Sequence, residues 1–199
     1  MAVLRPSGSA CSYTMRRVRL SLSLFAVVAA GLSAGRAQAQ PVADEYQVKA
    51  AYLLNFARFV EWPADALPAS SPLIIVIVGD GPLGAALEEA LRGKSANGHP
   101  LRLRHLRWDD VLTPSHMLFI SASEESHLPQ VLRFLGQGSV LTVSDIDRFS
   151  LRGGVIEFRM VGNRVRFDIN RTSAGAAQLN ISSKLLSVAA AVHEGSAAR

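Results

Sequence analysis

The chain has 199 residues, 49% of them hydrophobic, and a formal net charge of +5 from 21 basic and 16 acidic residues. Five basic residues precede Gln40 and no acidic residue does, so the rest of the chain carries 16 charges of each sign. These five are Arg5, Arg16, Arg17, Arg19 and Arg36. The chain from Gln40 onward therefore has a net charge of zero, and it has no cluster of basic residues interleaved with aromatic ones. Both observations argue against a nucleic-acid-binding surface. Cys11 is the only cysteine and also precedes Gln40, which excludes a disulfide or thiolate site from a remainder long enough for one domain.

The N-terminal segment has the pattern of an export signal. Three arginines precede the apolar run Leu20–Leu32, and small residues lead up to Ala39 and Gln40. The apolar run is too short to span a bilayer comfortably, although an uncleaved membrane anchor remains an alternative. We therefore predict a cleaved signal over 1–39 with the cut between Ala39 and Gln40, one domain over 40–195 and a frayed tail over 196–199.

The stretch from Glu45 to Pro63 predicts a helix that Trp62-Pro63 ends, because proline disfavours helical geometry at the residue before it. Its apolar residues cover an arc too broad for a one-sided surface helix. The helix is therefore either sandwiched inside its own domain or in contact with a second chain along one flank. Lys49 falls within the apolar arc, and we expect it to extend outward to water.

Three continuous apolar runs predict strands covered on both faces, and a fourth segment alternates as a strand nearer the sheet edge does. The covered strands are Leu73–Val78, Met117–Ile120 and Val140–Val143, and the alternating strand is Leu101–Leu106. Helices are expected over Leu83–Arg92 and over Leu128–Leu135, which Gly136 closes, while Gly93–Pro100 reads as a loop.

A β-hairpin is predicted from Ile156–Met160 and Val165–Ile169, with Gly162-Asn163 as the turn. In that register Glu157 lies opposite Asp168, and Arg159 lies opposite Arg166. Like charges then face each other, so this polar face must be solvated or paired with another element.

Two helices are expected after the hairpin. Asn170 caps the first, Thr172–Gln178, and the second begins at Ser182 or Ser183 with an apolar stripe of Leu185, Val188, Ala189 and Val192. The whole order predicts a single compact α/β domain with a mixed, mostly parallel sheet flanked by helices and a C-terminal antiparallel hairpin.

The segment Gly79–Gly84 matches G-x-G-x-x-G between a strand and a helix, a pattern that favours an anion at the helix N-terminus. Pro82 removes one amide, and no ribose-binding acid ends the next strand, so we expect no nicotinamide cofactor. Two interpretations remain open, a tight turn and a small-anion niche. The niche would consist of Gly79, Asp80, Gly81 and Gly84.

The sequence indicates no catalytic or metal centre. The five histidines lack zinc-site spacing, and the serines lack a G-x-S-x-G elbow. We predict a protein that is not an enzyme and needs no cofactor. The alternative is a periplasmic domain or enzyme that binds a small molecule, either an anion or a nucleotide, through the Gly79–Gly84 loop.

Five blocks in order resemble the YfiR-like periplasmic repressors. They are KAAYLLNFARFVEWP (Lys49–Pro63), LIIVIVGDGPLG (Leu73–Gly84), HMLFISASE (His116–Glu124), VLTVSDIDRFSLRGGVIEF (Val140–Phe158) and VRFDINRTSAGAAQLNISSKLLSVA (Val165–Ala189). The resemblance implies a non-catalytic signalling protein with a compact α/β fold. It also implies a homodimer. Relatives often carry cysteine pairs, whereas this chain has Ser115-His116 where relatives tend to show a cysteine.

The resemblance also implies partners. YfiR binds the periplasmic sensor part of the inner-membrane diguanylate cyclase YfiN and represses it, which lowers cyclic di-GMP and biofilm formation. An outer-membrane-associated lipoprotein, YfiB, can sequester YfiR. The partner of this chain is thus expected to be such a cyclase or another sensor. The candidate partner or dimer surface consists of Tyr52, Phe56, Phe59, Glu157, Arg159, Arg166 and Asp168.

Overall fold

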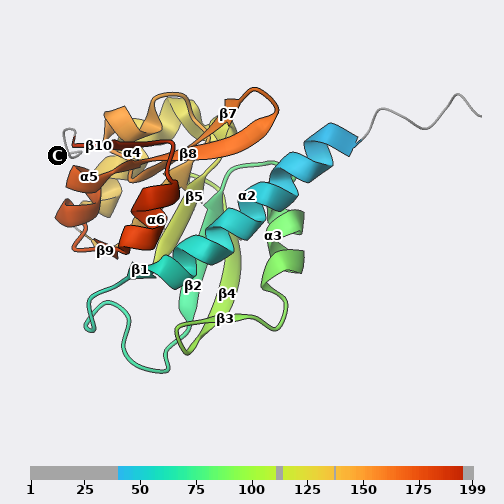
Figure 1. The fold of residues 1–199 in the computed structure, drawn as a ribbon. Coiled ribbons are helices and arrows are strands. Elements are labelled where there is room, and N and C mark those ends of the chain that lie inside the picture. Colours follow the sequence, from blue (N-terminus) through green and yellow to red (C-terminus); the bar gives the residue numbers. More distant parts are fainter. Residues whose placement is uncertain (1–39, 111–113, 137, 195–199) are drawn as a thin grey trace, which may run out of the picture. The chain divides into compact units, whose positions relative to one another are not determined.

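An eight-stranded mixed sheet organises the domain, with strand order β10-β8-β7-β6-β5-β2-β4-β3 (Figure 1). This computed structural model describes residues 40–110, 114–136 and 138–194, with side chains from Glu45 onward. The predicted signal (1–39) and tail (196–199) lie outside the described residues. The strands are β2 (Leu73–Val78), β3 (Ser95–Ala96), β4 (His99–Leu106), β5 (Met117–Ile120), β6 (Leu141–Ser144), β7 (Ile156–Val161), β8 (Arg164–Asn170) and β10 (Ala191–His193).

The four pairs β4-β2, β2-β5, β5-β6 and β6-β7 are parallel, whereas β7 and β8 form an antiparallel hairpin. The short strand β3 pairs antiparallel with β4, and β10 pairs parallel with β8. The predicted class, a single α/β domain with a mostly parallel sheet and a C-terminal hairpin, is confirmed.

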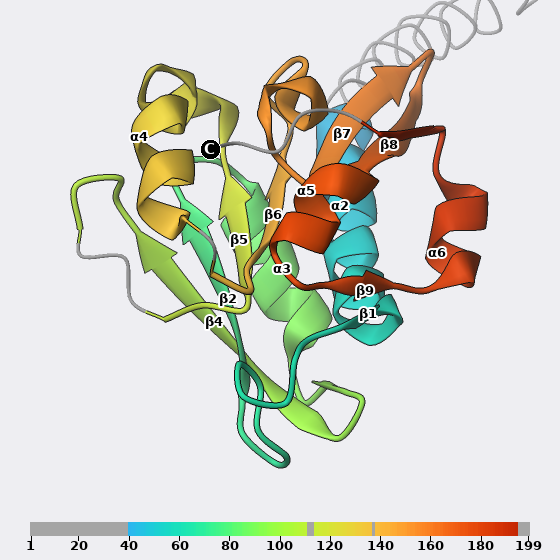
Figure 2. The same ribbon diagram turned by 90° about the vertical axis from the view of Figure 1, so that its left-hand side faces the viewer.

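The central strands are buried on both faces because helices lie on both sides of the sheet. Figure 2 shows α2 (Gln40–Phe59) and α3 (Leu83–Leu91) on one side and α4 (Leu128–Leu135) on the other. Along β2, Ile75 and Ile77 join the core under α2 and α3, whereas Val76 and Val78 join the core under α4. Continuous apolar strands therefore have the predicted double cover.

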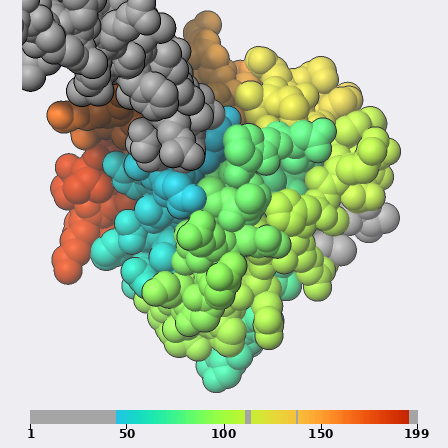
Figure 3. All heavy atoms as spheres, turned by 90° about the vertical axis from the view of Figure 1, so that its right-hand side faces the viewer, coloured from blue at the N-terminus to red at the C-terminus, as the bar shows by residue number. Residues whose placement is uncertain are grey.

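Helix α2 packs along the sheet beside α3, and Figure 3 shows these two helices from their solvent side. The rings of Tyr52 and Phe56 lie 5.1 to 6.0 Å from those of Phe158 and Phe167 on the hairpin. Such aromatic contacts add to the burial of apolar area. Much of the broad apolar arc of this helix is thus sandwiched inside its own domain.

The predicted end of α2 at Pro63 is wrong by one turn. The helix stops at Phe59, and β1 (Val60–Glu61) pairs antiparallel with β9 (Asn180–Ile181). The Ser182 N–H also donates to the Phe59 carbonyl over 3.0 Å. The last turn is lost because a segment more than a hundred residues away takes its backbone groups, which helical periodicity does not reveal.

The predicted loop 93–100 contains a small hairpin. Asn97 and Gly98 have positive φ values of 49° and 85° and connect β3 to β4. An Asn-Gly pair readily adopts the two left-handed conformations that a two-residue hairpin turn requires.

The C-terminal helices are α5 (Arg171–Ala176) and α6 (Ser183–Val188), separated by β9. Asn170 caps the first as predicted, by accepting from the Ser173 N–H over 3.0 Å, and the second begins at Ser183, where Ser182 accepts from the Leu185 N–H over 3.3 Å. The predicted apolar stripe is wrong from Val188 onward, since Val188 is exposed, 191–193 form edge strand β10, and Val192 is exposed as well. The edge of β8 offers backbone partners that a longer helix would forgo.

Candidate functional site

The carboxyl edge of the sheet is where this topology would place a ligand site. The chain passes from β2 to β4 and then returns to β5 on the opposite side of β2. Such a reversal opens a crevice between the two loops in doubly wound sheets. The loops that meet here are 79–82 after β2 and the one that opens the 3₁₀ helix η1 (Ala122–His127) after β5.

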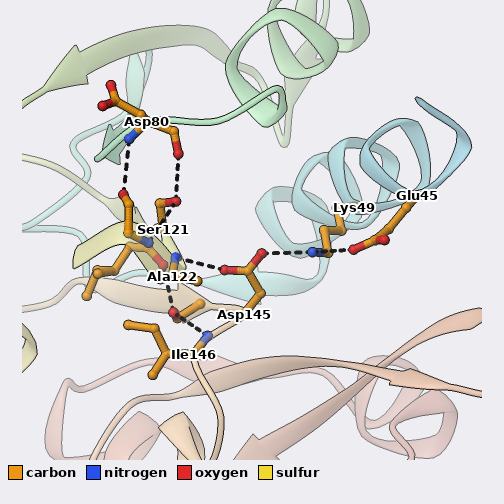
Figure 4. A network of polar contacts seen from close by, with 10 residues as sticks. Glu45, Lys49, Asp80, Ser121, Ala122, Asp145 and Ile146 are labelled. Carbon is orange, nitrogen blue, oxygen red and sulfur yellow. Dashed lines mark hydrogen bonds and ion pairs between the residues drawn. The ribbon is translucent and has the colours of Figure 1, made fainter. Parts of the chain in front are cut away.

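Side chains of the chain itself fill this crevice (Figure 4). The Ser121 Oγ–H donates to the Asp80 carbonyl over 2.8 Å, and the Asp80 N–H donates to Ser123 Oγ over 3.3 Å. The Gly79 N–H donates to the Leu106 carbonyl over 3.3 Å. Two amides of the predicted anion niche therefore already have partners within the chain.

Close packing accounts for two of the glycines in the G-x-G-x-x-G pattern. A Cβ at Gly79 would lie 2.6 Å from Ser123 Oγ, and Gly79 has a φ of +95° that favours glycine. A Cβ at Gly84 would clash with the His105 ring. The pattern thus matches the tight-turn interpretation, in which glycine lets two loops and a strand approach closely.

A buried ion cluster joins α2 to the same edge (Figure 4). Lys49 is only 4% exposed, and its ammonium nitrogen lies 2.7 Å from Glu45 Oε1 and 2.8 Å from Asp145 Oδ2. The second oxygen of Asp145 accepts from the Ala122 N–H over 3.1 Å. The expectation that Lys49 extends outward is wrong, because two carboxylates compensate its charge inside the fold.

These carboxylates also set the protonation of Lys49. Burial disfavours the charged ammonium, but the hydrogen bonds and negative charges of Asp145 and Glu45 outweigh it and raise the Lys49 pKa above 10.5. Lys49 therefore stays charged and holds the N-terminal half of α2 against the ends of β5 and β6.

The charged face of the hairpin is paired with neighbouring elements. The Glu157 carboxylate is buried and accepts from the backbone N–H groups of Arg148 and Ser150, each over 3.0 Å, and from the Ser150 Oγ–H over 2.7 Å. These donors belong to the start of the 3₁₀ helix η2 (Phe149–Arg152). The predicted register, with Glu157 opposite Asp168, is confirmed.

Asp168 is also buried, and its carboxylate lies 2.9 Å from the Arg159 guanidinium and 3.4 Å from the His193 ring. This ion pair crosses diagonally between β7 and β8, as cross-strand charge complementarity predicts. Arg166 lies opposite Arg159 and is exposed.

The seven candidate surface residues therefore separate into three environments. Phe56 lies in the core with Tyr52 half-buried beside it, and Glu157 and Asp168 are buried in polar networks. Exposed side chains remain at Phe59, Arg159 and Arg166.

Sequence reasoning missed an exposed apolar group at the tip of the β7–β8 hairpin. Met160 and Val161 are 47% and 53% exposed, and Val48 on α2 is also exposed. The tip lies beside the N-terminal half of α2 in Figures 1 and 2. Strand alternation places Met160 on the same face as Phe158, which packs against α2. It does not predict that the hairpin extends beyond the part of this face that is buried.

His116 organises the amino edge of the sheet. Its Nδ1 accepts from the Ile74 N–H over 2.9 Å, its Nε2–H donates to the Ala66 carbonyl over 3.0 Å, and its carbonyl accepts from the Trp62 indole N–H over 2.9 Å. Burial lowers the His116 pKa. This effect is larger than that of the hydrogen bond to the Ala66 carbonyl, which raises the pKa. The neutral ring thus fixes the connection between α2 and β2.

Within the described ranges, no three histidine, cysteine, aspartate or glutamate side chains gather closely enough to hold a metal ion. No helix in that part of the chain has the length and apolar character needed to cross a bilayer.

Comparison with known proteins assigns the family. The model of the family described as YfiR/HmsC-like matches residues 46–190. A crystal structure of a conserved domain protein from Vibrio cholerae O1 biovar El Tor is similar at 12% identity over 74% of this chain and 60% of that one, with a TM-score of 0.49, too remote to inform fold or function. Comparison with curated proteins gave no match. The chain therefore belongs to the YfiR/HmsC-like family, a family of periplasmic regulators without catalytic activity.

Proposed function

We propose that this protein is a periplasmic repressor that binds the sensor part of an inner-membrane diguanylate cyclase and holds the cyclase inactive. The observation that carries the proposal is the family match over 46–190, which includes almost all of the described domain. Repression would lower cyclic di-GMP and biofilm formation. The export signal expected over 1–39 supports the location that this role requires.

The partner surface in this proposal is centred on the hairpin tip, which we define as Met160 and Val161 with the flanking arginines Arg159 and Arg166. It extends to the neighbouring N-terminal half of α2, where Val48 is exposed. Exposed apolar side chains beside arginines are typical of protein interfaces, where arginine is enriched and the apolar centre is desolvated on binding. The buried Lys49 cluster fixes α2, which supplies Val48, so the surface is held in one geometry before binding.

Deletion of the gene tests the function. We expect cellular cyclic di-GMP and biofilm mass to rise several-fold and to return to the starting level on complementation. Co-purification with the periplasmic part of the cyclase from a membrane extract would identify the partner. Unchanged cyclic di-GMP in the deletion strain would contradict the proposal.

A charge at the tip tests the surface. Val161→Glu should leave folding intact, because the side chain is exposed, and should weaken cyclase binding by about tenfold or more through the cost of burying an unpaired carboxylate. Val188→Glu on α6 is the matched control, since Val188 is 56% exposed and lies outside the tip. Loss of binding in Val188→Glu alone would move the surface to α6.

Two further partners belong to the same proposal. A homodimer would be seen as a doubled mass in sedimentation equilibrium. An outer-membrane lipoprotein of YfiB type would compete with the cyclase for the repressor and raise cyclic di-GMP when overproduced. Competition in a pull-down with purified components would test this second partner.

A further inference from the structure

A cavity of about 150 Å³ lies beneath the C-terminal end of α2, at the amino edge of the sheet. Its apolar wall comes from the end of α2, β1, the loop before β2, β2 itself and β3. These residues are Ala57, Val60, Leu67, Leu73 and Ala96. The remaining lining residues, Glu61, Trp62, Asn97 and His99, form the polar and aromatic side.

Hydrogen-bond acceptors are left over on this side. His99 Nδ1 lies 2.8 Å from the Ser71 carbonyl and must donate to it, so Nε2 of the neutral ring carries a lone pair. The Asn97 amide nitrogen donates one N–H to the Arg58 carbonyl over 3.2 Å, which leaves its second N–H and its carbonyl oxygen.

The charge of the site is negative. The Glu61 carboxylate accepts from the Asn180 amide over 2.8 Å, and no ion pair involves Glu61 among the described residues. The Trp62 indole N–H donates to the His116 carbonyl over 2.9 Å, so the ring is held in place and this N–H is not available to a ligand. A carboxylate beside an indole ring favours a cation and disfavours an anion.

We propose that this cavity binds a small organic cation, namely a primary ammonium group on an apolar body about the size of a benzene ring. The ammonium would meet Glu61 and Trp62, and the body would lie against the apolar wall. A cavity of about this volume is known to accept benzene-sized ligands. This inference is independent of the repressor function, because it concerns another surface of the domain.

Trp62 provides a direct reporter. The chain has two tryptophans, and the other, Trp108, stacks on His127 beyond the opposite end of β4. In the Trp108→Phe variant of the full chain, we expect benzylamine to change Trp62 fluorescence saturably within roughly 10 mM, a range suited to so small a ligand. Benzylamine should also raise the Tm by mass action.

Neutral and anionic analogues define the chemical class. Benzyl alcohol should bind about tenfold more weakly than benzylamine, because it has no positive charge for Glu61 to attract. Benzoate should not bind measurably, because the Glu61 carboxylate repels it. Equal binding of the three probes, or no saturable response to benzylamine, would overturn the proposal.

Two substitutions at Glu61 and one control locate the site. Glu61→Gln should weaken benzylamine binding by about tenfold and leave benzyl alcohol unchanged, and Glu61→Arg should reverse the preference to benzoate. Both are expected to fold, because Glu61 is exposed. Glu88→Gln is the matched control, since Glu88 is exposed on α3 and does not line the cavity. Benzylamine affinity that is unaffected by either Glu61 change would refute the assignment.

Discussion

The two edges of the central sheet use their polar groups in opposite ways. At the carboxyl edge, Ser121, Ser123 and the Lys49–Asp145 pair fill the crevice and pair with one another and with the backbone. At the amino edge, a cavity remains between α2 and the β3–β4 hairpin, and Glu61 has no cationic partner among the described residues. In other doubly wound sheets this topology places ligands at the carboxyl edge. Here, internal hydrogen bonds and an ion pair connect the loops at that edge, and the cavity lies at the opposite edge.

The largest effect should come from breaking the buried ion cluster. Asp145→Asn leaves Lys49 buried with one carboxylate and weakens the bond to the Ala122 N–H, so the free energy of unfolding should fall by about 3 kcal/mol. Urea denaturation at neutral pH measures this loss. Glu45→Gln is the control and should cost about 1 kcal/mol, because Glu45 is more exposed than Asp145. Equal small losses would show that the carboxyl edge is not held by this cluster.

Close packing at the same edge predicts the next effect. Gly79→Ala should lower the free energy of unfolding by about 2 to 3 kcal/mol, because its Cβ would meet Ser123 Oγ at 2.6 Å in a backbone of positive φ.

Gly98→Ala separates the two causes. Gly98 also has a positive φ, but a Cβ there would meet no atom within 4 Å, so only the backbone cost of about 1 kcal/mol should appear. If the two alanine variants unfold at the same urea concentration, the crevice is less tightly filled than the structure indicates.

The smallest effect concerns the amino edge and depends on pH. The His116 pKa is lowered in the folded state, so the unfolded chain binds the proton more tightly. The stabilisation by neutral His116 is therefore complete above pH 6.5, the ordinary value, and is lost as the pH falls from 6.5 through the lowered folded pKa.

The His116→Asn variant isolates this contribution. The amide oxygen of the new side chain could still accept from the Ile74 N–H, but the amide does not titrate. The decline in unfolding free energy below pH 6.5 should therefore be shallower in the variant than in the wild type. Thermal unfolding at a series of pH values measures the difference. Parallel curves for the two proteins would assign the acid sensitivity to other groups.

Local patterns predicted much of the fold. Strand β5 and helix α4 have the predicted bounds, and the hairpin register is as expected, because each depends on periodicity and turn residues within a short segment. The candidate surface was harder to predict. Phe56 looked available on a wide apolar arc, but the facing rings of Phe158 and Phe167 cover it. Phe59, Arg159 and Arg166 stay candidates.

The sequence by itself determined the order of the main helices and strands, the charge balance of the residues after Ala39 and the family, since these depend on neighbouring residues and on blocks in a fixed order. The tertiary structure decided where the charges lie. The helical pattern alone predicts that Lys49 extends into water. In the fold it is buried, because Asp145, 96 residues away in the sequence, binds its ammonium group. Likewise, β1, β10 and the cavity exist because segments remote in sequence share backbone groups or leave a space between them, and no local pattern records such pairs.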